Sequence, residues 1–426
     1  MKIWYFHHYG TPYEIAGLHR PFQFGSFLKQ NGHEVAVFTS SYLHYANENM
    51  IVGKEKLLYR EYDGVSAVFV RTCGYFNSSV NRVLNMLQFG KRLAGASQWF
   101  IKEHWKPDVI IASSPHPFTV MAGQRIAKKL GVPCICEVRD LWPEVFFLGG
   151  LMKETSLLGK ILLRYERKIY EKADTLLFLK EGDHTYITDH KWDTSNGGKI
   201  DMSKCAYVNN GVDLSLFDKR VGDNVFSDED LESDKFKIVY CGAIRPVNNV
   251  GMLLDVAKKL DDNCLFIIYG TGNRLEELRQ RVIDENIKNV RFKGYVENKY
   301  IPYILSKSSL NILNYSGSTY NWSRGNSSNK LFEYLASGKP VVSTVKMGYD
   351  IIERYGCGYS VEECNADNIA EVINKVKTLS EKEYLDMSRA ARAAAEHFDI
   401  SNLAKDYEEI IKQTNIKYEA KGKTKK

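Results

Sequence analysis

Residues 329–338 read NKLFEYLASG, and the apolar run KPVVS follows them at 339–343. The spacing of the apolar residues, together with the polar loop RGNSS at 324–328, predicts a short helix that ends at Gly338 and is followed by a strand. A helix start offers unpaired N–H groups and a positive dipole end, which is where phosphate binds. Glu333 lies one turn further in, and its carboxylate suits the two hydroxyls of a diol such as a ribose. The stretch therefore predicts half of a nucleotide site.

Short apolar runs alternate with helical patterns along the whole chain. The first half predicts strands and helices at residues 3–6, 18–30, 34–39, 109–112, 120–130 and 134–138. The second half repeats the alternation at residues 236–241, 248–260, 265–269, 274–286, 290–293, 298–305, 310–314, 330–337 and 340–344. Strands separated by helices of this length form parallel β-α-β units. We expect the α/β class, with two Rossmann-like doubly wound domains that face each other across a ligand-binding cleft.

The length of 426 residues exceeds what one hydrophobic core usually supports, so two domains are expected. Residues 218–235 are polar and non-periodic, and we place the boundary there. The predicted division is a first domain at 1–217, a second at 218–398, a helix at 399–416 that returns to the first domain, and a basic tail at 417–426.

Composition and charge exclude several classes of protein. The apolar fraction of 44% is that of a globular protein, and the net charge of +6 is too small to predict a nucleic-acid partner. The start MKIWYFHHYG lacks the features of a secretory signal, and no apolar run approaches the roughly eighteen residues of a membrane span. Eight scattered cysteines show no zinc-site spacing, so we expect buried thiols. We predict a cytoplasmic protein.

Positive charge gathers at two places. Residues 75–105 interleave basic with apolar and aromatic side chains, and the tail is rich in lysine. Such a stretch fits a surface that rests on anionic lipid, which predicts a peripheral position at the inner membrane surface. An ordinary helix packed on the first sheet, with its lysines in water, explains the pattern equally well. The tail is either an electrostatic aid or an unattached end.

Glycine-bearing loops follow the predicted strands. The loop at 6–20 is too long for a G-x-G-x-x-G turn, but its Gly17 allows a phosphate or an acceptor to approach the backbone; a plain surface loop is the alternative. After strand 236–241 the turn GAIRPVNN carries Arg245, whose planar fork suits a diphosphate. A pair with a surface carboxylate is the alternative for this arginine. The glycine residues and the asparagine that complete this predicted edge are Gly242, Asn249, Gly270 and Gly272.

The strand at 134–138 ends in the sequence RDLWPE, which contains Arg139, Asp140 and Glu144. Three charged groups at the carboxyl edge of a strand are costly unless they face a cleft, so they are candidate catalytic residues. A structural salt bridge of Arg139 with one of the two carboxylates is the alternative.

Together these segments resemble the retaining glycosyltransferases of family 4, which have the GT-B arrangement of two Rossmann-like domains. RDLWPE at 139–144, and KLFEY and SGKPV at 330–341, resemble the branch that builds bacterial surface polysaccharides. The resemblance covers essentially the whole chain. Its segments are the Gly17 loop with GHEV at 32–35, RDLWPE, VNNGVD at 208–213, residues 242–249, GTG at 270–272, FKG at 292–294 and residues 329–342.

The resemblance implies roles for particular residues. Glu333 matches the second Glu of the E-x7-E motif, which binds the ribose of the donor, and Arg245 lies in the turn that holds the diphosphate. The donor-binding residues it implies are Gly17, Gly242, Arg245, Asn249, Gly270, Gly272, Asn329, Lys330, Leu331 and Glu333. The catalytic residues it implies are Arg139, Asp140, Glu144 and Arg245.

Three departures from the family pattern stand out. The first Glu of E-x7-E falls at Gly325, so Asn326, Ser327 or Asn329 is the substitute. The lysine that usually follows the diphosphate arginine is replaced in the turn at 248–249, which leaves Lys330 as the candidate cation. Many members have His-Asp where this chain has an arginine before its aspartate, at 139–140.

The expected reaction is the retaining, metal-independent transfer of a sugar from a UDP- or GDP-sugar to a polyprenyl-diphosphate-linked glycan at the inner membrane face. The product belongs to capsule, O-antigen or exopolysaccharide assembly. The nucleotide sugar is a co-substrate and no cofactor is expected; no D-x-D carboxylate pair is placed to hold a metal. Two alternatives are a sugar-nucleotide epimerase on the same frame and a nucleotide-sugar binding protein without turnover.

Overall fold

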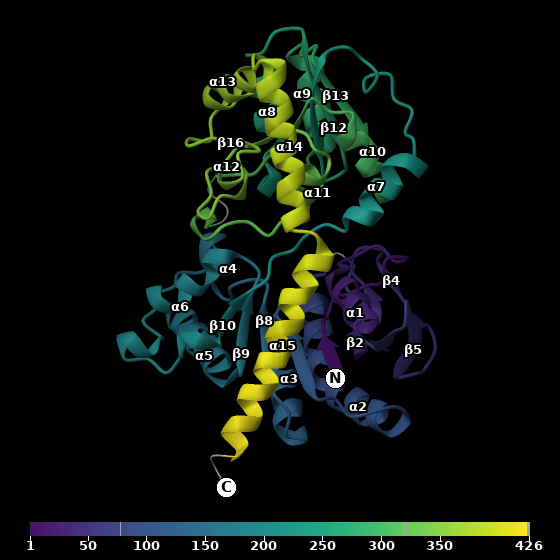
Figure 1. Ribbon diagram of the computed structural model, residues 1–426, viewed down its shortest axis with the longest axis vertical. Coiled ribbons are helices and arrows are strands. Elements are labelled where there is room, and N and C mark those ends of the chain that lie inside the picture. Colours follow the sequence, from purple (N-terminus) through teal and green to yellow (C-terminus); the bar gives the residue numbers. More distant parts are fainter. Residues whose placement is uncertain (77, 318–320, 424–426) are drawn as a thin grey trace. The chain divides into compact units, whose positions relative to one another are not determined.

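The structure is a computed structural model that describes residues 1–76, 78–317 and 321–423. The chain divides into two compact units (Figure 1). Unit 1 comprises Met1–Val208 and Leu403–Lys426, and unit 2 comprises Asn209–Asn402. The division falls at 208/209 and not in the polar stretch at 218–235. Residues 214–223, which overlap the start of that stretch, form helix α7, and α7 contacts other helices of unit 2.

Unit 1 is built on a sheet with the strand order β10-β9-β8-β7-β1-β2-β6-β5. Neighbouring strands are parallel except for β5, which pairs antiparallel with β6. The strands are β1 (Lys2–Phe6), β2 (Glu34–Ser40), β5 (Leu57–Tyr62), β6 (Val65–Val70), β7 (Val109–Ser113), β8 (Cys134–Val138), β9 (Thr175–Phe178) and β10 (Cys205–Tyr207), with the hairpin β3 (Tyr42–Leu43) and β4 (Glu48–Asn49) beside them.

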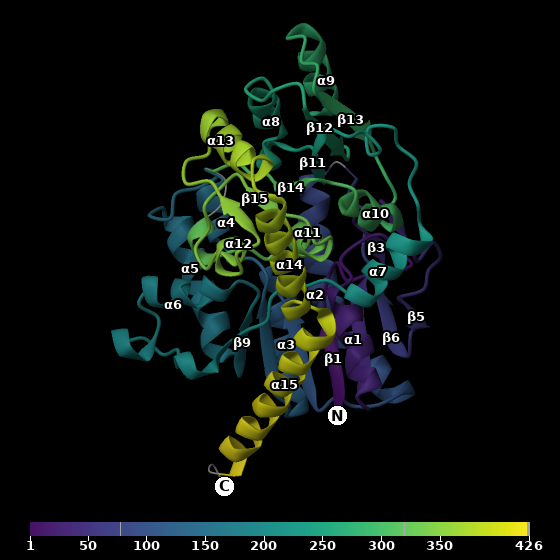
Figure 2. The same ribbon diagram turned by 45° about the horizontal axis from the view of Figure 1, so that its top comes forward.

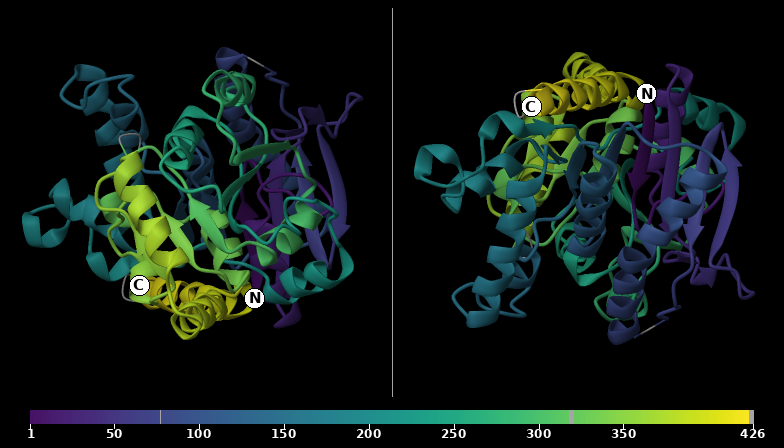
Figure 3. Two further views of the ribbon diagram at one scale, coloured as in Figure 1. Left: turned by 90° about the horizontal axis from the view of Figure 1, so that it is seen from above. Right: turned by 90° about the horizontal axis from the view of Figure 1, so that it is seen from below.

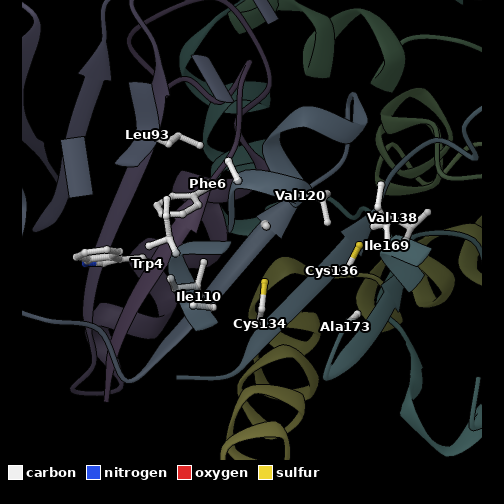
Figure 4. Close-up of a cluster of buried hydrophobic side chains, with 14 of the residues drawn as sticks. Trp4, Phe6, Leu93, Ile110, Val120, Cys134, Cys136, Val138, Ile169 and Ala173 are labelled. Atoms are coloured by element: carbon white, nitrogen blue, oxygen red, sulfur yellow. The ribbon is translucent and has the colours of Figure 1, made fainter. Parts of the chain in front are cut away.

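Helices cover both faces of this sheet. One face holds α2 (Ser79–Glu103), α3 (Pro117–Leu130) and α5 (Leu157–Lys172), and the opposite face holds α1 (Arg20–Gln30) and α15 (Ile400–Lys423), as the right panel of Figure 3 shows. The short helices α4 (Glu144–Leu148) and α6 (Thr185–Asp189) complete the unit. Trp4, Phe6 and Ile110 of the strands pack against Leu93 and Val120 of the helices in a continuous apolar core (Figure 4).

Helix α15 belongs to unit 1 from Leu403 onward. The ring of Tyr407 lies 4.7 Å from the ring of Phe24 in α1, and Thr414 is hydrogen-bonded to Thr175 of β9 at 2.7 Å. The helix continues to Lys423, so the part of the basic tail at 417–423 is helical, and the prediction for 424–426 lies outside the described residues.

Unit 2 is built on a parallel sheet with the strand order β13-β12-β11-β14-β15-β16. Its strands are β11 (Phe236–Cys241), β12 (Cys264–Tyr269), β13 (Val290–Gly294), β14 (Leu310–Leu313), β15 (Val341–Ser343) and β16 (Gly358–Ser360). Its helices are α7 (Leu214–Asp223), α8 (Val250–Ala257), α9 (Leu275–Asp284), α10 (Ile301–Ser306), α11 (Asn329–Ala336), α12 (Ile351–Arg354), α13 (Ala366–Lys377) and α14 (Glu381–His397). Figure 2 shows α14 beside α11.

The predicted class is confirmed: both units are doubly wound α/β sheets of Rossmann-like type. All eight cysteines are free, but Cys73, Cys205 and Cys364 are only half-buried. No helix among the described residues has both the length and the apolar character needed to cross a bilayer.

Candidate functional site

Two glycine turns lie in contact at the carboxyl edge of the unit 2 sheet. Gly242 follows β11 and Gly270 follows the neighbouring strand β12. Gly270 has a φ of 138°, and a Cβ on it would overlap the carbonyl oxygen of Gly242. A Cβ on Gly272 would overlap the carbonyl oxygen of Ile244 in the same way. Glycine permits this approach, and the predicted residues Gly242, Gly270 and Gly272 are thereby brought together as a floor of bare backbone.

Lys330 lies across this floor. Its Nζ is 3.3 Å from the Oδ1 of Asn248 and 3.5 Å from the hydroxyl of Tyr240. The ammonium also lies over two aromatic rings, 5.0 Å from the centre of Tyr240 and 4.6 Å from that of Tyr315. Burial lowers the pKa of Lys330 to about 8, so the side chain is still mostly charged at neutral pH. The structure thus places a partly desolvated cation at the mouth of the β11 turn.

The turn after β11 is held by asparagine side chains. The Nδ2 of Asn248 donates to the carbonyl of Ala243 at 2.6 Å, and the Nδ2 of Asn314 donates to the carbonyl of Asn248 at 2.6 Å. Asn249 has a φ of 44° and precedes α8 without a side-chain cap. The place where the resemblance expects a lysine therefore holds a neutral amide that contacts Lys330.

Arg245 is exposed in the same turn. Its side chain makes no hydrogen bond or ion pair with the described part of the chain, so the alternative of a surface carboxylate partner is not seen there. The guanidinium extends from the residue that precedes the short 3₁₀ turn Pro246–Asn248.

Glu333 lies in the second turn of α11 and is half-buried. Burial raises the pKa of its carboxyl to about 7, although the positive charges of Arg220 and Lys330 oppose that shift. Within the described ranges its carboxylate has no hydrogen-bond partner. A carboxylate in this state has both oxygens available for the hydroxyls of a ligand.

The other predicted residues of α11 differ in access. Asn329 is exposed at the first position of the helix, after Ser328. Leu331 is buried in the core at 1% exposure, and its N–H donates to the carbonyl of Ser328 at 3.1 Å. The side chain of Leu331 therefore packs in the core, and its N–H is bonded within the first turn of the helix.

The position of the missing first Glu has its own geometry. Gly325 has a φ of 97°, a left-handed backbone that would strain a glutamate. Asn326 is buried, its Oδ1 accepts from the N–H of Ser328 at 2.9 Å, and its Nδ2 has no hydrogen-bond partner among the described residues. Of the three proposed substitutes, Asn326 is thus the one with a buried, unused donor.

Sequence reasoning missed Asn209 and Asn210 as site residues. The Nδ2 of Asn209 donates to the carbonyl of Asn326 at 3.0 Å, and the Nδ2 of Asn210 donates to the carbonyl of Ser327 at 2.7 Å. They fix the loop before α11. The signal for these residues in the sequence is the VNNGVD segment. The loop that they contact lies 117 residues further along the chain, so no local pattern connects the two.

The charged residues predicted in unit 1 follow β8 at its carboxyl edge. Arg139 is half-buried, and its Nη1 has no hydrogen-bond partner among the described residues. Asp140 is exposed, and Glu144 begins α4. No ion pair joins Arg139 to either carboxylate in the described ranges, so the structural salt bridge is not seen.

His7 is a third residue that sequence reasoning missed. It follows β1, and it is fully buried with both ring nitrogens unpaired in the described part of the chain. Burial and the nearby charge of Arg139 lower the pKa of His7 well below its ordinary value, so the ring is neutral. The parallel order β8-β7-β1 brings this imidazole to the same edge as Arg139.

Gly17 belongs to unit 1, whereas the other predicted donor-binding residues belong to unit 2. A Cβ on Gly17 would overlap the hydroxyl of Thr11, and the N–H of Thr11 donates to the carbonyl of Leu18 at 3.0 Å. The packing inside the loop alone accounts for a glycine here.

Comparison with known proteins matches each half of the chain to a glycosyltransferase domain model. Residues 25–196 match the model of the glycosyl transferase 4-like domain, and residues 223–394 match that of the glycosyl transferases group 1. TuaH of Bacillus subtilis (strain 168), named as a glycosyltransferase of teichuronic acid biosynthesis, is 25% identical over 209 residues. That match spans 48% of this chain and 51% of TuaH, about half the length of each.

Solved structures share the fold at low identity. HepE of Anabaena, solved in complex with UDP, aligns with a TM-score of 0.67 and 16% identity over 97% of this chain and 100% of its own. Sucrose-phosphate synthase of Thermosynechococcus elongatus gives 0.70 and 15% over 97% and 98%. WaaG, a glycosyltransferase involved in lipopolysaccharide biosynthesis, gives 0.64 and 16% over 96% and 99%. These likenesses show the GT-B fold. The two matched family models identify the two parts of the chain as glycosyltransferase domains, the first of them glycosyl transferase 4-like.

Proposed function

We propose that the protein transfers a sugar from a nucleotide-diphosphate donor, with retention of configuration, to a hydroxyl of a lipid-linked glycan in surface-polysaccharide assembly. The observation that carries this proposal is the group formed by the glycine floor, the Lys330 ammonium and the unpaired Glu333 carboxylate at one sheet edge. Backbone and cation suit a diphosphate, and the carboxylate suits a ribose. The names of TuaH and WaaG support the polysaccharide context.

The donor proposed first is a UDP-sugar, with a GDP-sugar as the alternative to be compared. HepE has been solved with UDP and with UDP-glucose, which supports uridine for a chain of the same fold. In this proposal the ribose hydroxyls donate to Glu333 while the diphosphate lies on Gly242 and Gly270 next to Lys330.

The chemistry is a substitution on one face of the sugar. The bond from the anomeric carbon to the leaving phosphate oxygen breaks, the acceptor oxygen attacks from the same side, and its proton passes to that phosphate oxygen. Lys330, Arg245 and the N–H groups at the start of α11 stabilise the negative charge of the departing diphosphate. With this much positive charge the proposal requires no metal, no other cofactor and no separate enzymic base.

The acceptor is assigned to unit 1. Arg139 and Asp140 lie at one sheet edge, where they offer a donor and an acceptor to glycan hydroxyls or to a diphosphate, and the buried, neutral His7 lies at the same edge. Helix α2 exposes Val80 (78%) and Val83 (50%) beside basic residues, which supports a peripheral position on anionic lipid.

The first test is thermal denaturation in the presence of UDP-sugars, GDP-sugars and each free nucleotide, with wild type and Glu333→Ala. We expect a rise of several degrees for one nucleotide class that is lost in the variant. Glu371→Ala, an exposed glutamate of α13, is the control and should keep the rise. No rise with any nucleotide would refute the donor site.

Turnover is tested separately with radiolabelled donor and membrane extract from a polysaccharide-producing bacterium. Transfer of label to lipid, with the sugar in the configuration of the donor, supports the proposal. Gly325, which replaces a family carboxylate, favours a nucleotide-sugar binding protein as the second candidate. Binding without transfer or donor hydrolysis would support that candidate, and donor epimerised without acceptor would indicate an epimerase.

A further inference from the structure

A pocket of about 510 Å³ opens at the amino edge of the unit 1 sheet, between the ends of α3 and α5. Its size is that of a small-molecule site. The buried residues at the bottom of the pocket are apolar: Ala127, Val132, Cys134 and Ile169. Tyr418 of α15 also lines it, so three helices far apart in the sequence meet at this pocket.

Four cations line the pocket above its apolar bottom. Arg125 and Lys128 belong to α3, and Lys168 and Lys172 belong to α5. All four side chains are exposed, and none forms a hydrogen bond or an ion pair with the described part of the chain. Their charges therefore face water and the pocket without a protein partner.

The nearby carboxylates are occupied elsewhere. Asp174 is the one acidic residue that the described wall contains, and its Oδ2 accepts the backbone N–H of Cys134 at 2.9 Å. Desolvation raises the pKa of Asp174 above its ordinary value. Of the two acids of α5, Glu171 is paired with Arg167 at 2.8 Å, and the buried Glu166 accepts hydrogen bonds from two tyrosines. The pocket thus carries an excess of positive charge that an anion would neutralise.

Helix dipoles explain only part of this charge. A cation in the last turn offsets the partial negative charge of a helix end, which accounts for Lys128 and Lys172. Arg125 and Lys168 lie one turn earlier, where the dipole contributes little. Like charges three or four residues apart also destabilise a helix, and each helix carries one such pair in the wall. Helix stability therefore leaves two of the four cations unexplained.

The bottom of the pocket favours an anion that also has an apolar part. The side-chain donor of Gln124 is already bonded to the carbonyl of Ile169 at 2.8 Å, and the buried residues around it are apolar. A nucleobase or a sugar placed there would lose hydrogen bonds to water without replacing them, whereas a hydrocarbon would lose none. The cations and the bottom together suit an anionic amphiphile.

The pocket shares one face of unit 1 with the exposed apolar start of α2. Helices α2, α3 and α5 pack on the same side of the sheet, with α3 in the middle (Figure 3). At the start of α2 four side chains are between 44% and 78% exposed: Val80, Val83, Leu84 and Leu87. A bilayer lying against this face would touch both the apolar start of α2 and the cationic pocket.

We propose that this pocket binds the headgroup of an anionic phospholipid, with the phosphate beside the four cations and the first acyl carbons on the apolar bottom. The proposal rests on the membrane position given in the proposed function, and it adds the class of lipid and the site that selects it. A free phosphate offers the same charge without the apolar part. A zwitterionic lipid offers the apolar part, but the lysines repel its ammonium group.

The test is calorimetric titration of the full chain with dihexanoyl phosphatidylglycerol, dihexanoyl phosphatidylcholine and glycerol 3-phosphate, each lipid below its micelle-forming concentration. The two lipids share their acyl chains and differ in net charge, and glycerol 3-phosphate lacks the chains. We expect phosphatidylglycerol to bind at least roughly tenfold more tightly than either of the others. Equal binding of phosphatidylcholine would overturn the selection by charge. Equal binding of glycerol 3-phosphate would overturn the lipid in favour of a free phosphate.

Two double variants locate the binding. Lys128→Gln with Lys168→Gln removes one cation from each helix of the pocket and should weaken phosphatidylglycerol binding roughly tenfold or more. Lys288→Gln with Lys382→Gln, at exposed lysines of unit 2, is the matched control: it changes the net charge equally and should bind like wild type. An equal loss in both double variants would indicate a general effect of charge and would overturn the pocket, as would unchanged binding by the pocket variant.

A UDP titration of the same samples separates this proposal from the proposed function. UDP binding that is unaffected in the pocket variant shows that the variant is folded and that only the lipid site has changed. If wild type binds phosphatidylglycerol but no nucleotide, the proposed function fails while the pocket stands. If it binds nucleotide but not phosphatidylglycerol, the pocket proposal alone fails.

Discussion

At the scale of single residues, the distribution of positive charge is the feature that distinguishes the proposed donor site. The β11 turn holds the neutral Asn248 where the family resemblance expects a lysine, and Lys330 reaches the same point from α11. The two positions are 82 residues apart and meet because β11 and β14 are neighbours in the sheet. A cation at the proposed diphosphate position is therefore retained although its place in the sequence has changed.

This exchange predicts a rescue. Lys330→Ala should weaken UDP binding roughly 10- to 100-fold, because a charged hydrogen bond contributes about 1.5–3 kcal/mol. Adding Asn248→Lys to that variant should restore much of the affinity, whereas uridine, which lacks the diphosphate, should bind all variants alike. Calorimetric titration measures each affinity. Failure of the double variant to improve on Lys330→Ala would contradict a shared position for the two cations.

The two titratable groups of the site predict a bell-shaped pH dependence of UDP affinity. Glu333, with a pKa of about 7, must be ionised to accept both ribose hydroxyls, so affinity falls as the pH drops below about 7. Lys330, with a pKa of about 8, must be protonated, so affinity also falls above about 8.

The measurement is the affinity for UDP and for uridine, determined by calorimetric titration at pH values from 5.5 to 9.5. Uridine should show only the acid limb, losing about tenfold per pH unit below the pKa, and Glu333→Gln should remove that limb for both ligands. An acid limb of wild-type strength in Glu333→Gln would assign it to another group.

At the scale of elements, the glycine turns after β11 and β12 form one unit. The carbonyl of Gly242 occupies the space that a Cβ of Gly270 would need, and the N–H of Gly270 donates to the carbonyl of Gly294 at 2.7 Å. The floor depends on backbone contact between neighbouring strands, so a change in one turn moves the other.

Gly270→Ala is accordingly expected to displace the floor as well as strain its own backbone. Gly356→Ala is the matched control in unit 2: it has a φ of 64° but nothing within 4 Å of the added Cβ. The control should cost about 1–2 kcal/mol of unfolding free energy and keep UDP affinity. Gly270→Ala should cost more and should also weaken UDP binding at least tenfold. Urea unfolding and UDP titration measure both; equal effects of the two substitutions would contradict the floor.

Sequence patterns predicted the β-α-β elements well but not every pairing between neighbouring strands. Strand β11 and helix α11 lie where the apolar spacing placed them, because β11 packs in the large core of unit 2 and the apolar residues of α11 are buried. The hairpin of β5 and β6 was not predicted, although Asp63-Gly64, both with positive φ, forms its turn. That turn is an antiparallel signal, whereas the alternation of strands and helices indicates only parallel units.

The chemistry of the site was predictable only in part. Glu333 and Lys330 stand in one recognisable motif, so local sequence was enough to select them. The partners of Lys330 and the unpaired ring of His7 depend on strand order and burial, which are properties of the assembled sheet and not of any short segment.

At the scale of the whole molecule, the chain leaves unit 1 after Val208 and returns to it at Leu403. One buried cation of unit 1 contacts both segments: Arg20 donates to the carbonyl of Val208 at 2.9 Å, and its guanidinium lies 5.7 Å from the ring centre of Tyr407. Its counter-ion is Glu137, with the Nε of Arg20 2.9 Å from a carboxylate oxygen. The ends of unit 1 are thus tied to the strand that carries the predicted catalytic residues.

Glu137→Gln is predicted to loosen unit 1 as a whole while leaving unit 2 intact. Removing one partner of a buried pair leaves an uncompensated charge and costs about 3–5 kcal/mol, whereas Asp218→Asn, which breaks the exposed pair with Arg392 in unit 2, should cost less than about 1 kcal/mol.

The positive charge of Arg20 opposes desolvation and holds the pKa of Glu137 at about 2, below its ordinary value of 4.5. The pair therefore contributes its full stability above about pH 4.5 and loses it as the pH falls toward 2, so the variant's deficit should be present at pH 7 and should shrink between pH 4.5 and 2. Hydrogen–deuterium exchange followed by peptide mass spectrometry is the measurement: amides of β1, β8 and α15 should exchange faster in Glu137→Gln, and those of β11 and β12 should not. Faster exchange spread evenly over both units would show that this pair acts on the whole chain and not on unit 1.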